Sequence, residues 1–134
     1  MEIADKIAVV SGGGSGIGRA AVLALVVRGA RVIVADIDED AGRQTVDLAT
    51  GKSGTAVFVR CDVTKTEDLA RACACAVEHF GRLDIAFNTA GIGGEDLFAA
   101  DPGDWARVIE VDLTAVIDAT RIAVREMKRA GQGG

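Results

Sequence analysis

The 134-residue sequence contains no tyrosine, one histidine and one proline. No tyrosine phenol is therefore available among these side chains to donate or accept a proton during catalysis. The single histidine, His79, has no serine or carboxylate context typical of a catalytic triad. The sequence thus offers no obvious catalytic dyad or triad.

Long apolar runs are also missing from the chain. No window reaches the ~18 uninterrupted apolar residues that a membrane helix requires. The first residues lack the basic segment followed by an apolar segment that marks a signal peptide. We therefore expect a cytoplasmic protein with no membrane partner.

Cysteines are few and badly spaced for a metal site or a disulfide framework. Cys61, Cys73 and Cys75 form no C-x-x-C pair, and their number is odd. Cys73 and Cys75 lie two positions apart on an expected helix, so their side chains point to different sides. We expect reduced thiols and no bound metal.

Positive charge does not dominate any part of the chain. The formal net charge is −5, and the acidic residues are spread along the sequence. A nucleic-acid backbone would be repelled rather than attracted. The length suits one domain with its own core, so residues 1–134 are expected to form a single unit.

Glycine is abundant, and it gathers near the start of the chain. Ile7 to Val10 is short, β-branched and apolar, which is typical of a strand buried on both faces of a parallel sheet. Glycines then lead into a helix, where the backbone can approach a phosphate group and the helix N-terminus can face it. The expected nucleotide-binding residues of this loop are Ser11, Gly12, Gly14, Ser15, Gly16, Ile17 and Gly18.

A second apolar strand, residues 31–35, ends at Asp36. A dinucleotide-binding βαβ unit places an acid at this point, where it accepts hydrogen bonds from the adenosine ribose. Neither Ile37 nor Asp38 supplies a cation for a 2′-phosphate, so the sequence favours NAD(H) over NADP(H). Alternatively, Asp36 and the acids that follow it only cap the next helix.

Apolar strands and amphipathic helices alternate along the rest of the chain. This order predicts an α/β fold with a parallel sheet. Helices are expected at Arg19–Arg28, 39–50, 66–80 and 103–129. A further strand is expected at 55–61, and a turn followed by a strand at 81–87.

Three motifs resemble those of the short-chain dehydrogenase/reductase family. Ser11 with Gly12-x-x-x-Gly16-x-Gly18 resembles its T-G-x-x-x-G-I-G motif. The Asp62-Val63 pair and the segment 88–91, Asn-Thr-Ala-Gly, resemble its D-V and N-N-A-G motifs. The resemblance implies a Rossmann-like, doubly wound parallel sheet of four βα units with strand order 3-2-1-4.

The family resemblance also assigns further roles to residues. It implies that Asp62 faces the adenine amino group beside Val63. It places Asn88, Ala90 and Gly91 next to the ribose on the nicotinamide side. Asp112 stands where the family usually has an asparagine of the proton relay. Because an aspartate donates only when protonated, Asp112 departs from the family pattern.

The resemblance implies an NAD-dependent oxidoreductase that moves a hydride between NAD(H) and an alcohol or ketone. In the family, the catalytic serine and the Y-x-x-x-K pair follow in the next strand and helix. This sequence stops before that segment, so we expect the N-terminal, cofactor-binding half, inactive by itself. Two alternatives stay open: a noncatalytic dinucleotide-binding module, and an S-adenosylmethionine methyltransferase.

The expected helix 103–129 is apolar on two sides. One stripe consists of Val108, Asp112, Val116, Ala119 and Ala123. The other consists of Ile109, Leu113, Ile117, Thr120 and Val124. One stripe can cover the sheet, and an exposed second stripe would be a liability on a monomer. We therefore expect a homo-oligomer that forms through this helix.

Overall fold

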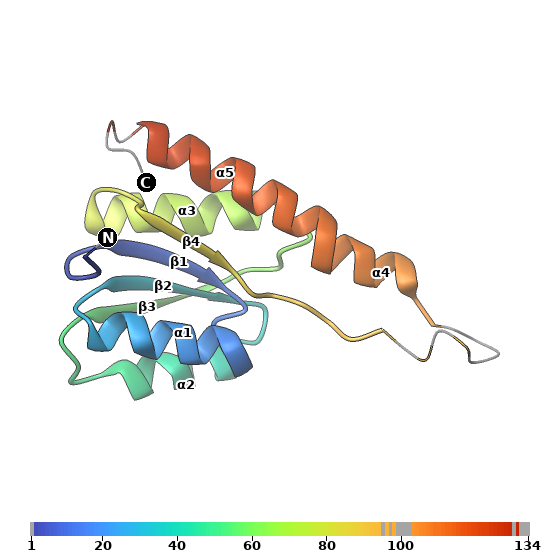
Figure 1. Cartoon of the computed structure of the whole chain (residues 1–134), viewed down its shortest axis with the longest axis horizontal. Coiled ribbons are helices and arrows are strands. Elements are labelled where there is room, and N and C mark those ends of the chain that lie inside the picture. Colours follow the sequence, from blue (N-terminus) through green and yellow to red (C-terminus); the bar gives the residue numbers. More distant parts are fainter. Residues whose placement is uncertain (1, 95, 97, 99–102, 130, 132–134) are drawn as a thin grey trace.

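A computed structural model describes residues 2–94, 96, 98, 103–129 and 131. Four parallel strands form one sheet between two layers of helices (Figure 1). Helices α1 and α2 cover one face, whereas α3 and α5 cover the other. The elements are β1 (Ile7–Ser11), α1 (Gly16–Val27), β2 (Arg31–Asp36), α2 (Glu39–Ala49), β3 (Thr55–Arg60), α3 (Thr66–Phe80), β4 (Ile85–Asn88), α4 (Trp105–Ile109), a π-helical turn η1 (Glu110–Thr114) and α5 (Ala115–Arg129).

The strands lie in the order β3-β2-β1-β4, which confirms the predicted 3-2-1-4 order. In the centre of the sheet, Val9 is in register with Ile33 on one side and Ala86 on the other. Because all strands are parallel, their carboxyl ends meet at one edge. The loops that follow β1, β2, β3 and β4 therefore come together there.

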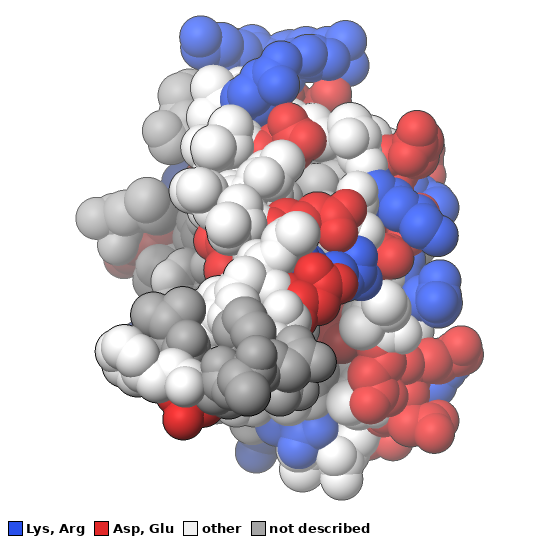
Figure 2. All heavy atoms as spheres, turned by 90° about the vertical axis from the view of Figure 1, so that its right-hand side faces the viewer, with Lys and Arg blue, Asp and Glu red and all other residues white. Residues whose placement is uncertain are grey.

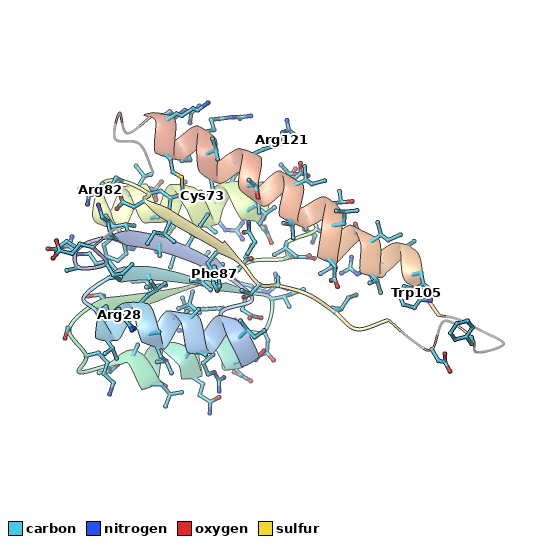
Figure 3. The ribbon with its side chains drawn as sticks, viewed as in Figure 1. Arg28, Cys73, Arg82, Phe87, Trp105 and Arg121 are labelled. Carbon is cyan, nitrogen blue, oxygen red and sulfur yellow. The ribbon has the colours of Figure 1, made fainter. Side chains whose placement is uncertain are left out.

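The two central strands are buried on both faces, as their continuous apolar sequence predicts. Ile7 and Val9 of β1 pack with α3 and α5, whereas Ala8 and Val10 pack with α1 and α2. The same alternation continues in β2, because successive side chains of a strand point to opposite faces. Cys73 lies in the first of these clusters and is 5% exposed, so it serves as core packing (Figure 3).

The last helical segment differs from the prediction in its start and its phase. It begins at Trp105 rather than at 103, and a π-helical turn at Glu110–Thr114 joins α4 to α5. A π turn adds one residue to the helical repeat and rotates the preceding side chains relative to the following ones. The buried positions are Val111, Ala115, Ala119 and Ala123. Val108 is half-buried and Asp112 is exposed, although the predicted stripe groups both with Ala119 and Ala123.

The second predicted apolar stripe does lie on the surface. Ile109, Leu113, Ile117 and Val124 are between 41% and 56% exposed. Within the part of the chain that the structure describes, no helix is both long and apolar enough to cross a membrane. The same residues contain no group of three or more potential metal ligands.

Candidate functional site

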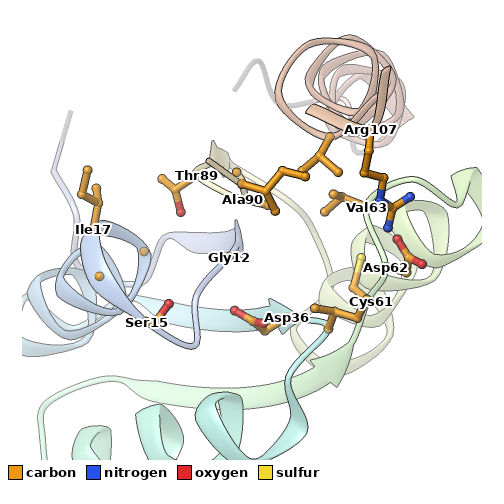
Figure 4. Close-up of a pocket in the computed structure, with 16 residues that line it drawn as sticks. Gly12, Ser15, Ile17, Asp36, Cys61, Asp62, Val63, Thr89, Ala90 and Arg107 are labelled. Carbon is orange, nitrogen blue, oxygen red and sulfur yellow. The ribbon is translucent and has the colours of Figure 1, made fainter. Parts of the chain in front are cut away.

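A cavity of about 340 Å³ opens at the carboxyl edge of the sheet (Figure 4). Its walls come from the glycine loop, the segments after β2, β3 and β4, and the helix that begins at Trp105. The lining residues are Gly12, Ser15, Gly16, Ile17, Gly18, Asp36, Ile37, Cys61, Asp62, Val63, Thr89, Ala90, Gly91, Ile92, Arg107 and Val111.

Most of the residues predicted from the sequence thus line one cavity. Three predicted residues do not line it: Ser11, Gly14 and Asn88. Ser11 and Asn88 lie behind it, against small voids under α5. Gly14 belongs to the loop itself, and its backbone N–H donates to Asp36.

Glycine is required in the loop because the backbone segments approach closely. Gly12 has φ +70°, and a Cβ there would lie 2.6 Å from the backbone nitrogen of Ala90. A Cβ at Gly18 would lie 2.0 Å from the carbonyl oxygen of Gly12 and 2.6 Å from Oγ1 of Thr89. Non-bonded atoms cannot pack at such distances. The glycines therefore allow the ends of β1 and β4 and the start of α1 to touch.

The N-terminus of α1 faces the cavity without a compensating negative charge. Ser15, the N-cap, makes no side-chain capping hydrogen bond, and the first turn contains no acidic residue. A Cβ at Gly16 would meet nothing within 4 Å, so the space beside the helix end is open. The partial positive charge of a helix N-terminus favours an anion at this point. The loop therefore fits a phosphate group.

Asp36 stands at the end of β2 with its carboxylate fixed in place. Oδ2 accepts the backbone N–H of Gly14 at 2.7 Å, and Oδ1 accepts that of Asp38 at 3.0 Å. Each carboxylate oxygen keeps a second lone pair for a further donor. Asp36 is not the cap of α2, because Asp38 fills that position and accepts from Ala41 at 3.0 Å.

Arg19 holds the glycine loop against α2, a role that sequence reasoning did not identify. Its guanidinium donates to the carbonyl oxygens of Gly14 and Ala41 and to the side chains of Gln44 and Thr45. The Thr45 hydroxyl is fully buried. These bonds join the loop to a helix that begins about 20 residues later along the chain, so local spacing gives no signal for them.

The wall after β3 consists of Cys61, Asp62 and Val63. Oδ1 of Asp62 accepts from the hydroxyl of Thr64 at 2.7 Å and from its backbone N–H at 3.1 Å. The bond from the Thr64 hydroxyl is the main reason that the pKa of Asp62 lies below its ordinary value. Asp62 therefore presents a carboxylate to the cavity at neutral pH.

Behind that wall, a buried carboxylate fixes the turn. Asp68 is 8% exposed, and its Oδ2 accepts the backbone N–H of Asp62 at 2.9 Å. Arg71 pairs with Asp68 at 3.0 Å and donates to the carbonyl oxygen of Arg60 at 2.9 Å. The Asp68–Arg71 pair thus holds the backbone on both sides of Cys61 and keeps the wall in one position.

At the end of β4, some residues of the predicted segment 88–91 join neighbouring elements, and others line the cavity. Thr89 donates from its hydroxyl to the carbonyl oxygen of Ser11 at 2.6 Å, which joins β4 to β1. Asn88 donates to the Thr120 hydroxyl at 3.3 Å, so its amide contacts α5 rather than a neighbouring strand. Ala90 and Gly91 line the cavity.

Asp112 lies next to this segment, in the π-helical turn. Its Oδ1 accepts the backbone N–H of Ile92 at 2.9 Å, and the carboxylate stands close to Gly91. The aspartate therefore fixes the loop after β4 to the helix. It is absent from the cavity lining.

Cys61, Thr89, Ile92, Arg107 and Val111 also line the cavity, although the sequence did not mark them as binding residues. Arg107 and Val111 belong to an ordinary amphipathic helix pattern, which does not tell which side will face a site formed by other elements. Figure 2 looks at this edge of the sheet and shows acidic side chains over much of the face, with basic ones at its upper end and also scattered along its right side and at its lower end.

The family model described as short chain dehydrogenase matches residues 6–134. The chain belongs to the short-chain dehydrogenase/reductase family. The predicted resemblance is thereby confirmed, as is the Rossmann-like fold.

Among curated proteins, trans-4-hydroxycyclohexanecarboxylate dehydrogenase of Sinomonas cyclohexanicum is 39% identical over 139 residues, which cover 96% of this chain and 52% of that protein. The 7alpha-hydroxysteroid dehydrogenase of Escherichia coli (strain K12) is 31% identical over 133 residues, which cover 99% and 52%. The chain therefore spans about half the length of these curated relatives.

Solved structures agree with this match. The crystal structure of hydroxysteroid dehydrogenase from Escherichia coli has a TM-score of 0.88 at 31% identity, covering 98% of this chain and 56% of that one. A short-chain type dehydrogenase/reductase from Mycobacterium ulcerans has a TM-score of 0.91 at 27% identity, covering 99% and 50%. The strand order and helix layers described above are thus those of known family structures.

Proposed function

We propose that the cavity binds NAD(H) for an oxidoreductase of the short-chain dehydrogenase/reductase type. The observation that supports this most is the shape of the loop: Gly12 and Gly18 allow close packing, and the N-terminus of α1 faces open space. The pyrophosphate would lie at residues 15–18, next to backbone N–H groups. Bound NAD(H) supplies a hydride acceptor or donor at its nicotinamide ring.

The ribose of the adenosine half would lie at Asp36, and the base beyond it. Both oxygens of Asp36 are oriented by backbone donors, which suits acceptance from two ribose hydroxyls. A 2′-phosphate at this point would meet the carboxylate at close range. We therefore expect NAD(H) to bind more tightly than NADP(H), with Ile37, Asp62 and Val63 around the base. Ala90 and Gly91 would lie towards the nicotinamide ribose, with Asn88 behind them.

Where the catalytic segment of the family is present as well, the substrate would be a small-molecule alcohol or ketone. The related dehydrogenases named above carry hydroxylated rings or steroids in their names. No tyrosine is present among the 134 residues, so we expect this chain to bind NADH without turning over an alcohol. A noncatalytic dinucleotide-binding module predicts the same binding, whereas the family match argues against a methyltransferase.

Trp105 provides a direct test of binding, because it is the only tryptophan in the sequence. Reduced nicotinamide absorbs where tryptophan emits, so NADH should quench Trp105 emission in a saturable way. Calorimetry would give the same dissociation constant. Saturable binding of S-adenosylmethionine without any binding of NADH would contradict the proposal.

We further propose a cytoplasmic homo-oligomer that forms through the helix 105–129. The support is the row of exposed apolar side chains at Ile109, Leu113, Ile117 and Val124. Apolar rows of this kind usually mark an interface.

A further inference from the structure

Arg107 is the one arginine or lysine among the described residues that line the cavity. It faces a site that otherwise contains two carboxylates, Asp36 and Asp62. Its guanidinium points from α4 towards Asp62 (Figure 4). Besides the hydrogen bond from Thr64, the charge of Arg107 contributes to the lowered pKa of Asp62.

The backbone around Arg107 is fixed by several contacts. The backbone N–H of Arg107 donates to Oδ1 of Asp104, which caps α4, at 3.0 Å. The Trp105 ring lies against Gly94, where a Cβ would meet its carbon atoms within 2.8 Å, and Figure 3 shows Trp105 at the start of the helix. The guanidinium itself donates to Oε2 of Glu110 at 2.9 Å.

The position of Arg107 relative to the glycine loop indicates which part of a ligand it would meet. Ser15 and Ile17, at the phosphate end, lie on the far side of the cavity from Arg107 (Figure 4). Asp36 lies between these two ends. A group that continues from a ribose at Asp36, away from the loop, would enter the space between Asp62, Val63 and Arg107.

We propose that Arg107 is a binding residue for the purine base and lays its planar guanidinium against the adenine ring. This inference rests on the proposed NAD(H) site. A guanidinium stacks favourably on an aromatic face, and the half-buried surface of Val63 offers an apolar wall nearby. Arg107 then adds affinity for any ligand that carries the base, whether or not the ligand carries phosphate.

The test compares three ligands that differ in which group they carry. Adenosine has the base and no phosphate, ADP-ribose has both, and nicotinamide mononucleotide has a phosphate without adenine. Their affinities are measured by displacement of NADH from the wild-type chain and from Arg107→Ala and Arg107→Lys. Circular dichroism and thermal unfolding check that each variant folds.

We expect Arg107→Ala to weaken the binding of adenosine and of ADP-ribose by the same factor, about 3- to 30-fold. The affinity for nicotinamide mononucleotide should not change. Arg107→Lys should weaken the binding of adenosine and ADP-ribose by most of this factor as well, because it keeps the charge without the planar face. Arg121→Ala is the matched control: Arg121 also pairs with an acid three residues away, at 3.2 Å, but on the outer side of α5 (Figure 3). It should bind all ligands like wild type.

Two results would overturn the inference and leave the proposed function intact. If Arg107→Ala weakened the binding of ADP-ribose but not that of adenosine, the guanidinium would be contacting phosphate. If both variants bound every ligand like wild type, Arg107 would make no contact. By contrast, failure of the wild-type chain to bind NADH would refute the proposed function, and the inference with it.

Discussion

Single carboxylates determine what the cavity selects. Asp36 is the residue nearest to a 2′-phosphate in the proposed site, and its two oxygens are already held by Gly14 and Asp38. Its position cannot shift easily to relieve repulsion, because both backbone donors are parts of fixed turns. The charge at this one residue should therefore decide between the two nicotinamide cofactors.

We predict that Asp36→Arg shifts the ratio of NADH to NADPH affinity by more than about tenfold towards NADPH. The substitution removes a like charge and adds a cation that can pair with phosphate. Titration of both cofactors against Trp105 emission measures the ratio. Asp40→Arg, an exposed acid in the first turn of α2, is the control and should leave the ratio unchanged. An unchanged ratio in Asp36→Arg would exclude Asp36 from the ribose site.

The three thiols should differ in reactivity because they differ in burial. Burial raises the pKa of Cys61 to about 12, with Asp68 adding to the effect, and burial raises that of Cys73 to about 11. Thiolate is the reactive form, so neither should react at pH 8. Burial raises the pKa of Cys75 as well, but Cys75 is only half-buried and is the most accessible of the three thiols, so we predict that iodoacetamide labels it alone. Mass spectrometry counts the labels, and the unfolded chain in urea should carry three. Labelling of folded Cys61 would contradict this account of the cavity wall.

The glycine loop acts as a unit in which backbone contacts replace side chains. Gly18→Ala would force a methyl group into the carbonyl oxygen of Gly12. We predict a loss of about 1–3 kcal/mol in the free energy of unfolding and loss of detectable NADH binding. Urea denaturation and NADH titration measure the two effects.

Gly93→Ala is the matched control for this prediction. A Cβ at Gly93 would meet nothing within 4 Å, and its φ lies outside the left-handed region. The control should therefore behave like wild type. If Gly18→Ala bound NADH normally, the close approach of α1 to β1 and β4 would not be needed for the site.

The helical segment 105–129 lines the cavity before and within its π-helical turn, Glu110–Thr114, and packs on the core after it. The π-helical residues place Val111 against the cavity, and α5 then turns Ala115, Ala119 and Ala123 towards the core. In an uninterrupted α-helix, Val108 and Asp112 would lie on the same side as Ala119 and Ala123, as the predicted stripe has them. The extra residue in the π turn explains why Val108 and Asp112, at and before the turn, are not buried, whereas Ala119 and Ala123 after it are.

If the exposed apolar row on this helix is the subunit interface, charges placed in it should change the oligomeric state. Leu113→Glu with Ile117→Glu places two charges in the middle of the row. We expect the double variant to be a monomer where the wild-type chain is an oligomer, because a charge cannot be buried unpaired in an apolar interface. Sedimentation velocity at micromolar concentration measures this. Lys128→Glu, on an exposed position of the same helix, should leave the state unchanged. A monomeric wild-type chain would contradict the proposed interface.

The molecule as a whole depends on a buried carboxylate at the amino edge of the sheet. Asp84 is 8% exposed, and its Oδ2 accepts from the backbone N–H of Ile7 and from Nε of Arg82, each at 2.9 Å. Burial acts to raise the pKa of Asp84, but these hydrogen bonds outweigh it and hold the pKa below 3.8. A lowered folded-state pKa means that Asp84 stabilises the fold above pH 3.8 and loses this effect as the pH falls through the folded value.

We predict that Asp84→Ala lowers the free energy of unfolding by about 2–3 kcal/mol at pH 7, because it leaves the Ile7 N–H and Arg82 without their acceptor. The difference from wild type should shrink at pH 3. Urea denaturation at both pH values measures it, and Asp40→Ala should show little change at either. An equal difference at both pH values would mean that the Asp84 charge is not the cause.

Several features of the protein follow from the local pattern of residues. The apolar runs of β1 and β2 specify buried parallel strands, because only a sheet covered on both faces accommodates them. The spacing of Gly12, Gly16 and Gly18 specifies a tight turn into a helix, since Gly12 and Gly16 have positive φ and a Cβ at Gly12 or Gly18 would meet backbone atoms. Asp36 follows from its place after the second strand. Neighbouring residues were enough for each of these predictions, and the strand order came from the family resemblance.

Other features depend on contacts between residues far apart in the chain. Three contacts arise only when the crossover helices bring separate loops to one edge of the sheet. Arg107 lies over Asp62, Arg19 donates to the carbonyl oxygen of Gly14, and Asp68 accepts the backbone N–H of Asp62. The periodic pattern of a helix indicates that one side is apolar, but it does not indicate which neighbours the polar side chains of the helix will contact. The three-dimensional arrangement therefore placed a cation in the cavity that residue spacing did not reveal.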